Sequence, residues 1–264
     1  MLVCTLGDLL LDVIVRLDST LAPGDDATAT TALTPGGQAA NVAAWAAALG
    51  ADARVVAVRG NDDAGALVRR ELSTRGVEVS GPQGPRTGTV VSLVQPDGDR
   101  TMASDRGSAP DLRADDLEAQ WFVCDVLHLS GYSLMREPIA GAATHAARLA
   151  RTNGATISVD LSSWTHIERF GETFRSALAQ VGPDVVFGNE REWQALGDFD
   201  ATTSVVKRGA AGISVNGDGH DAHSAEALDT TGAGDALAAG FLVGGPQLAL
   251  ATAARCIGQV GAMP

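Results

Sequence analysis

The feature that most restricts the fold of this chain is an alternation of strand-like and helix-like stretches that begins near residue 121. Short apolar runs of strand length are each followed by a longer stretch of helical length. Parallel strands need such crossovers, and the helices then cover both faces of the sheet. The alternation therefore predicts an α/β fold with a mainly parallel central sheet. The predicted strands are 123–129, 156–161 and 185–188, and the predicted helices are 139–153 and 173–181.

The N-terminal part of the chain supplies more elements of the same kind. An apolar run at 2–6 suits a buried strand, and 54–58 and 66–75 are typical of a strand and a helix separated by a turn at 60–65. Ligands of such folds bind at the carboxyl ends of the strands. The polar residues expected at those ends are Asp160 and Asn189.

Two further segments favour a small β-sheet outside the main one. A polar segment of alternating Ala and Thr before residue 34 suits an exposed strand, and a β-rich run, a Pro-Asp-Gly turn at 96–98 and a second run indicate a hairpin. We expect this β excursion to comprise approximately 13–33 and 87–103. Because no repeat or low-complexity linker divides the chain, we interpret 1–264 as one domain.

A glycine-rich turn near the end of the chain, DTTGAGD at 229–235, runs into an apolar helix at 236–242. Helix starts have unpaired N–H groups and positive potential, so a turn of small residues there can bind an anion such as phosphate. An ordinary N-cap would explain Asp235 but not the whole arrangement. The motif therefore favours a phosphoryl-transfer site. The residues with converging amides are Gly232, Ala233 and Gly234.

A second glycine-rich turn, Gly36-Gly37, opens an Ala-rich helix that extends through residue 49. Gln38 and Asn41 place hydrogen-bonding side chains at this helix start, where they suit hydroxyl groups. Asn41 has an equally common role as a helix cap. Asp12, an acid within an apolar stretch, is either a substrate contact near a strand end or a strand-edge residue that faces water.

The net charge of −13 argues against a nucleic-acid partner, although local donors and a metal can still bind anionic substrates. Cys4, Cys124 and Cys256 form no close pair and no metal-ligand spacing, which is typical of buried thiols in a reducing compartment. No signal-peptide pattern and no run long enough to cross a membrane is recognised. We therefore expect a cytoplasmic protein without a membrane partner.

Four motifs, in the expected order, resemble those of the ribokinase-like (PfkB-type) carbohydrate kinases. The N-terminal pair, 36–41 and 60–65, is similar to the first family signature, and 229–235 is similar to the second. Asn189-Glu-Arg-Glu192 resembles the family's Asn-x-x-Glu motif, and 207–212 resembles its nucleotide-side glycine loop. Together these motifs span nearly the whole chain, which is short for the family after Gly197 and after Gly244.

The resemblance implies a ribokinase-like αβα sandwich with a small β-sheet lid, which in the family often also forms a homodimer interface. It implies ATP-dependent transfer of the γ-phosphoryl group to a hydroxyl, usually a primary alcohol. Asp235 matches the catalytic base, and Gly232, Ala233 and Gly234 match the anion hole.

The same resemblance assigns the nucleotide and cation sites. Asn189 and Glu192 match organisers of Mg²⁺ and its water shell. Asp229 and Thr231 match positions that often bind a monovalent cation, usually K⁺. The residues expected beside the nucleotide phosphates are Asn189, Lys207, Gly209, Gly212, Gly232 and Gly234.

For the acceptor, Asp12, Gly37 and Asn41 match sugar-hydroxyl contacts, and Gly36 and Gln38 belong to the same motif. Arg106 and Tyr132 are further candidates for the pocket without motif support, and Arg106 could equally be a surface charge. Because no cluster of basic residues is visible in the sequence, we expect an unphosphorylated sugar or sugar derivative as acceptor.

Three alternatives remain open at this stage. A nucleoside kinase on the same fold would use aromatic side chains around a base, and the candidates are Tyr132, Phe122 and the four Trp residues. A binding or regulatory protein without turnover would have no need of Asp235. A dinucleotide-dependent dehydrogenase is disfavoured because no G-x-G-x-x-G motif follows the first strand.

Overall fold

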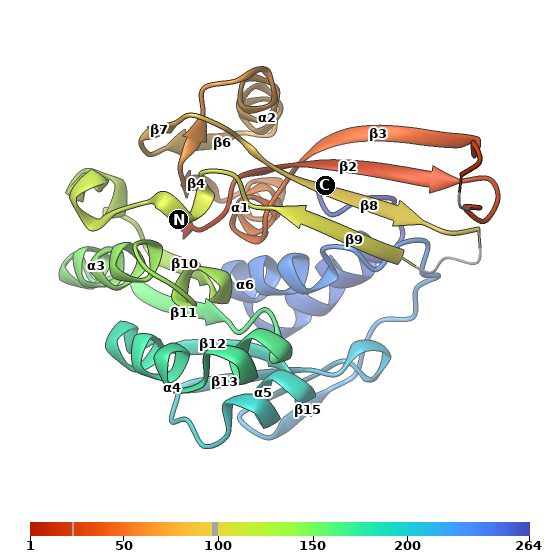
Figure 1. Ribbon diagram of the computed structural model, residues 1–264. Coiled ribbons are helices and arrows are strands. Elements are labelled where there is room, and N and C mark those ends of the chain that lie inside the picture. The colour runs from red at the N-terminus through yellow and green to blue at the C-terminus, as the bar shows by residue number, and fades with distance from the viewer. Residues whose placement is uncertain (23, 97–99) are drawn as a thin grey trace.

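A computed structural model describes residues 1–22, 24–96 and 100–264 of the chain. Its core is a nine-stranded sheet with the strand order β15-β14-β13-β12-β11-β10-β1-β4-β6, in which all neighbours are parallel except β13-β14 and β14-β15 (Figure 1). The predicted mainly parallel sheet is thus confirmed. The strands are β1 (Leu2–Leu6), β4 (Asp52–Val56), β6 (Val77–Ser80), β10 (Val126–Ser130), β11 (Thr156–Asp160), β12 (Val185–Asn189), β13 (Thr203–Lys207), β14 (Ile213–Val215) and β15 (Asp218–His220).

Six helices pack on the two faces of this sheet within the described part of the chain, so that two apolar cores form (Figure 1). The central strand β1 serves both cores, because Val3 faces one and Cys4 and Leu6 face the other. One face carries α1 (Gln38–Ala48), α2 (Asp63–Thr74) and α6 (Ala233–Ile257), and the other carries α3 (Ile139–Thr152), α4 (Trp164–Val181) and α5 (Glu190–Leu196). The 3₁₀ turns are η1 (Ala109–Asp111), η2 (Ala114–Asp116), η3 (Ala119–Phe122), η4 (Gly131–Leu134) and η5 (Gly209–Ala211).

A separate four-stranded sheet projects from the rest of the molecule, as Figure 1 shows. Its strand order is β3-β2-β8-β9, with antiparallel outer pairs and a parallel central pair. The two segments expected to form a small sheet do pair, although β2 and β3 together reach further than predicted. Residues 97–99 of the predicted hairpin turn lie outside the described residues. The strands are β2 (Leu10–Leu17), β3 (Ala29–Gly36), β8 (Gly88–Val94) and β9 (Arg100–Asp105), and a further small pair is β5 (Arg59–Gly60) with β7 (Gln83–Gly84).

Helices α2 and α4 begin earlier than predicted. Helix α2 begins at Asp63 because the carboxylate of Asp62 caps it, accepting the N–H of Gly65 at 2.8 Å. Helix α4 begins at Trp164, and its first turns are separated from the rest by Gly171, which has φ 45° and ψ −116°. The segment before Gly171 is rich in aromatic and β-branched residues of weak helix propensity, which is why the sequence pattern indicated only the second half.

Helix α6 corrects one expectation about membranes. It has 25 residues and, by length and composition alone, is apolar enough to cross a bilayer. Its backbone leaves helical geometry at Gly244 and Gly245, directly before Pro246. Residues on both sides of this break, such as Ala238 and Leu250, pack in the core that α1 shares. We therefore describe α6 as a core helix of the fold.

Candidate active site

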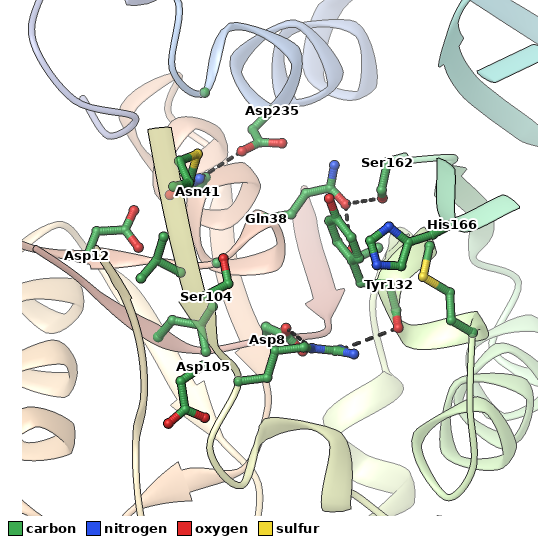
Figure 2. A pocket seen from close by; sticks show the side chains of 18 of the residues that line it. Asp8, Asp12, Gln38, Asn41, Ser104, Asp105, Tyr132, Ser162, His166 and Asp235 are labelled. Atoms are coloured by element: carbon green, nitrogen blue, oxygen red, sulfur yellow. Dashed lines mark hydrogen bonds and ion pairs between the residues drawn. The ribbon is translucent and has the colours of Figure 1, made fainter. Parts of the chain in front are cut away.

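The main cavity lies between the carboxyl ends of the central strands and the small sheet, with a volume of about 940 Å³. Its lining comes from segments spread over the whole chain, as Figure 2 shows. Of the residues predicted to contact an acceptor, all but Gly36 line it. Those residues are Asp12, Gly37, Gln38, Asn41, Arg106 and Tyr132, and Gly232, Thr231 and Asp235 line it from the C-terminal turn.

The C-terminal turn is held in a conformation that requires glycine. Gly232 has φ 75° and ψ 0° at the start of α6, and a Cβ there would lie 2.6 Å from Ala262. Within the described residues, the N–H groups of Gly232 and Gly234 donate to no backbone acceptor, whereas Ala233 N–H donates to Thr230 O at 3.3 Å. Two of the three predicted anion-hole donors are therefore free.

The carboxyl group of Asp235 is buried, with 9% exposure, directly after these donors. Asn41 Nδ2 donates to Asp235 Oδ2 at 2.7 Å (Figure 2). Burial raises the pKa of Asp235 to about 7, although the hydrogen bond from Asn41 and the charge of Lys207 act in the opposite direction. A carboxyl group with a pKa near neutrality suits general-base catalysis.

Asn41, the hydrogen-bond partner of Asp235, has a second polar side-chain atom that is available to a ligand. Asn41 Oδ1 is buried and has no hydrogen-bond partner among the described residues. Asn41 lines the cavity, so its side chain can meet a donor from a bound molecule while its amide nitrogen stays on Asp235. A hydroxyl group is the kind of donor that this oxygen lacks.

Lys207 lies beside the anion hole but already has an ionic partner. Its Nζ donates to both carboxylate oxygens of Asp160, at 3.0 and 2.8 Å, and a Cβ built on Gly234 would lie 3.4 Å from Nζ. Burial lowers the pKa of Lys207, but the carboxylates of Asp160, Glu192 and Asp235 outweigh it and hold the pKa above its usual value. The ammonium is therefore charged and close to the place predicted for phosphate.

Asn189 and Glu192 have a structural role that the resemblance of their motif did not indicate. Asn189 Oδ1 accepts the N–H of Glu192 at 2.9 Å, and Glu192 Oε2 accepts the N–H of Asn189 at 2.8 Å. The pair forms a capping box at the start of α5. Burial raises the pKa of Glu192, whose second oxygen is uncommitted within the described residues. That oxygen and the Asn189 amide are compatible with a hydrated Mg²⁺, which needs few direct protein ligands.

No group of three or more His, Cys, Asp or Glu residues in the described ranges could hold a metal ion unaided. A divalent cation would thus need oxygen ligands from a bound nucleotide and from water.

The two glycines predicted to lie beside the nucleotide, Gly209 and Gly212, differ in how much space surrounds them. Gly212 has φ 87°, and a Cβ there would lie 2.0 Å from His220 O, so its glycine is needed for the strand turn itself. Gly209 has φ 58° and faces open space. Neither lines the main cavity, and their proximity to a nucleotide stays a prediction.

Asp229, predicted to support a monovalent cation, is already bound by protein donors. Its carboxylate accepts the N–H and hydroxyl of Thr231 and the N–H of Gly261, and it pairs with Arg100 Nη1 of β9 at 3.2 Å. Although burial raises the pKa of Asp229, these hydrogen bonds and the charge of Arg100 hold it below its usual value. The charge that a K⁺ ion would balance is balanced by Arg100, so these residues do not fit the ion in this conformation.

The acceptor side of the cavity is built by two adjacent glycines and their neighbours. A Cβ on Gly36 would lie 2.0 Å from Asp12 Oδ1, so the absence of a side chain makes room for that carboxyl group. A Cβ on Gly37, which has φ 96°, would lie 2.3 Å from Asp8 O. Burial raises the pKa of Asp12 to about 7, against the charge of Arg100.

Three residues near the acceptor side, Ser130, Ser162 and Asp8, were not identified from the sequence. Gln38 Oε1 accepts the hydroxyl groups of Ser130 and Ser162, each at 2.6 Å (Figure 2). Arg106, for which a surface position was equally open, pairs with Asp8 at 2.6 Å and lines the cavity. These serines and Asp8 follow predicted strand ends, which is the one signal that could have identified them.

A base of near-neutral pKa beside free helix-start amides is an arrangement suited to phosphorylating a hydroxyl group. The class defined by this fold and cavity is therefore an α/β phosphotransferase.

Comparison with known proteins identifies the family. Residues 1–256 match the model of the pfkB family carbohydrate kinases. Over 249 residues the chain is 32% identical to the ATP-dependent ribose-1-phosphate kinase of Halopiger xanaduensis, covering 88% of this chain and 80% of that protein. It is 29% identical to a fructokinase of Escherichia coli over 277 residues, covering 96% and 87%. The solved structure of adenosine kinase from Sinorhizobium meliloti superposes with a TM-score of 0.88 at 27% identity, covering 99% and 95%.

The chain belongs to the pfkB family of carbohydrate kinases. It is an enzyme that phosphorylates a sugar or a sugar derivative, and the family assignment indicated by its motifs is confirmed.

The near-neutral pKa of Asp235 predicts the pH dependence of catalysis. A general-base role for Asp235 requires the ionised carboxylate, so in that role kcat/KM for the acceptor should rise with pH and level off above about 7. Asn41→Ala removes the hydrogen bond that favours the ionised form and should move this limb to higher pH. A pH series of initial rates measures the shift, and a limb that stays in place would contradict the role of Asn41.

The same burial predicts a gain of stability in Asp235→Asn. Because the folded pKa is raised from 3.8 to about 7, the unfolded chain loses this proton first, and stability falls as pH rises between those values. The variant avoids that loss, so its free energy of unfolding should exceed the wild-type value by a few kcal/mol at pH 8, at about 1.4 kcal/mol per pKa unit. Urea unfolding at pH 8 and at pH 4.5 tests this, since the gap should shrink at the lower pH.

The pairing of Asp229 with Arg100 predicts that wild-type turnover is equal in Na⁺ and K⁺ buffers. Arg100→Ala leaves the partly buried carboxylate without a cationic partner, and activity of this variant should increase when K⁺ is added. The ratio of rates with and without K⁺ is the readout for both proteins. A wild-type enzyme that is inactive without K⁺ would show that the ion displaces Arg100.

Proposed function

We propose that this protein transfers the γ-phosphoryl group of ATP to a hydroxyl group, a primary alcohol, of a sugar or sugar derivative, with Asp235 as the general base. The observation that carries the proposal is the position of Asp235. Its buried carboxyl group follows the free N–H groups of Gly232 and Gly234 at the start of α6 and faces the cavity.

In this proposal the acceptor hydroxyl donates its proton to Asp235 as its oxygen attacks phosphorus. The amides of Gly232 and Gly234 bind the transferring phosphoryl group, because helix-start donors stabilise the negative charge without reorganisation. Ala233 contributes little to this hole, since its N–H already donates to Thr230 O. A loose phosphoryl transition state requires mainly this kind of positioning and charge stabilisation.

The other acceptor hydroxyls bind to Asp12, Asn41 and the amide of Gly37, whereas Gly36 makes room for the Asp12 carboxyl group. Asn41 is well placed for this because its Oδ1 lacks a partner in the described structure. Asp12 lines the cavity and burial raises its pKa to about 7, so it accepts or donates a hydrogen bond according to pH.

Nucleotide phosphates bind next to the anion hole, near Lys207 and Gly209. When bound, Mg²⁺ would neutralise charge on the nucleotide phosphates, with Asn189 and Glu192 holding its water shell. We assign Gly212 to the strand turn that supports this loop. The relative from Halopiger xanaduensis, which is named as ATP-dependent, supports ATP as the donor.

We further propose a cytoplasmic enzyme that forms a homodimer through the small sheet. Free, buried thiols at Cys4, Cys124 and Cys256 suit a reducing compartment. Strand β9 is exposed along its whole length, and Leu33 of β3 and Met102 of β9 are exposed apolar residues on the same sheet.

A nucleoside is the second candidate acceptor. The adenosine kinase structure has the same fold, and Tyr132 packs edge-on against His166, which stacks on Phe170. Of the aromatic residues considered from the sequence, only Tyr132 lines the described cavity, because Phe122 and Trp45 are fully buried.

The general-base role predicts that Asp235→Asn lowers kcat by roughly 100-fold or more while ATP affinity stays near the wild-type value. ADP release with a panel of sugars and nucleosides measures turnover, and calorimetry measures nucleotide binding. A variant that keeps turnover within a factor of about ten would contradict a base of the usual strength. Arg148→Gln, an exposed change on α3, is the matched control for handling and folding.

A further inference from the structure

The wall of the main cavity includes basic side chains that the proposed chemistry does not use. Arg136 follows η4, and His166 and Arg169 lie three residues apart on α4, so these two project from the same face of the helix. All three line the cavity that contains Asp235. They come from two elements on the α3–α4 face of the molecule, whereas Asp235 comes from the α6 face.

Neither arginine has a carboxylate partner in residues 1–22, 24–96 and 100–264. The nearby acid Glu137 instead accepts the N–H of Gly141 at 3.1 Å. Arg169 contacts only the ring of Phe170 among the aromatic residues, at 5.5 Å from the ring centre. In a chain with a net charge of −13, acidic partners are abundant, so two unpaired guanidinium groups on a cavity wall indicate a ligand charge.

A third guanidinium extends the basic wall towards the acceptor site. Arg106 uses Nε and Nη2 for Asp8 and for Tyr132 O, and its Nη1 makes no hydrogen bond within the described structure. Its Cζ lies 6.0 Å from the centre of the Tyr132 ring. Asp8 neutralises Arg106, so the unbalanced positive charge lies with Arg136 and Arg169.

The pKa of His166 reflects its burial and the positive charge of nearby arginines. Burial lowers the pKa of His166, and the charges of Arg169 and Arg106 lower it further. Arg169 and Arg106 therefore act on this imidazole from different elements. His166 Nδ1 interacts with Ser163 Oγ at 2.9 Å, which leaves Nε2 on the other side of the ring.

The side chain of Gln38 relates His166 to the proposed base. The amide of Gln38 favours the ionised form of Asp235, and Gln38 Oε1 accepts the hydroxyl of Ser162, four residues before His166. In Figure 2, Gln38 lies between Asp235 and His166. A cavity of about 940 Å³ is at the upper end of the range for small-molecule sites, which leaves room beyond one sugar ring.

We propose that the acceptor is a sugar phosphate, whose existing phosphate is bound by Arg136, Arg169 and His166 while its free hydroxyl reaches Asp235. The inference rests on the proposed function for the hydroxyl end. Two guanidinium groups and an imidazole N–H offer charge-assisted hydrogen bonds to phosphate oxygens. The similarity to a kinase named for ribose 1-phosphate agrees with this class of acceptor.

This inference replaces the expectation of an unphosphorylated acceptor. That expectation rested on the absence of a basic cluster in the sequence, where the basic residues of the cavity lie far apart. Arg106, Arg136 and Arg169 are separated by about thirty residues at each step, and only the fold brings them to one cavity.

The test compares ribose 1-phosphate with ribose, fructose and adenosine as acceptors for wild type, Arg136→Gln, Arg169→Gln and the double variant. Each removed charge-assisted contact should raise KM for ribose 1-phosphate by roughly 10- to 100-fold, with kcat much less affected. Arg148→Gln, an exposed arginine of α3 outside this cavity, should leave KM unchanged. Both target arginines are exposed, so the variants should keep the wild-type melting temperature.

Calorimetry of ribose 1-phosphate without nucleotide separates this inference from the proposed function. Binding to wild type that is lost in the double variant would support the phosphate site even if no acceptor were phosphorylated. Turnover of ribose, fructose or adenosine with a KM lower than that of ribose 1-phosphate, and insensitive to both arginine variants, would overturn the inference and leave the kinase function intact.

Discussion

The hydrogen bond from Asn41 to Asp235 joins two helix starts that lie 194 positions apart in the sequence. Each helix follows a glycine with positive φ, Gly37 before α1 and Gly232 before α6, and neither glycine has room for a side chain. Both helix starts therefore point at one cavity. Because the acid at their junction is buried, its charged form depends on the Asn41 amide and on the nearby ammonium of Lys207. The packing of α1 against α6 thus favours the ionised form of Asp235 and positions its carboxyl group.

Around Lys207 the protein places more negative than positive charge. Asp160, Glu192 and Asp235 all act on this one ammonium, next to amides that attract phosphate. A nucleotide that entered without a divalent cation would meet these carboxylates at close range and lose affinity. The pairing of Lys207 with Asp160 therefore fits a site whose anionic ligand arrives with its own counter-ion. It also explains how Lys207 can stay charged while buried.

The sequence predicted the αβα architecture because strand and helix periods are local properties, and it predicted the two glycine-rich turns because their function requires consecutive residues. It did not predict the double role of Asn189 and Glu192, since a capping box and a cation-organising pair share the same spacing. It also missed the first turns of α4, where His166 and Arg169 lie, because that segment has weak helix propensity and ends at Gly171. The pairing of Arg100 with Asp229 depends on how the small sheet lies over the turn, which no local pattern specifies.

The features that the sequence predicted and those that it missed belong to two different parts of the cavity. Phosphoryl transfer needs amides and a base within a few ångströms of one another, so a short continuous motif such as 229–235 can carry it. In our proposal, recognition of the acceptor's far end uses groups several bonds away, which lie after η4 and on α4. The acceptor of such an enzyme is therefore specified by tertiary structure, whereas the sequence signal for the reaction lies in one turn.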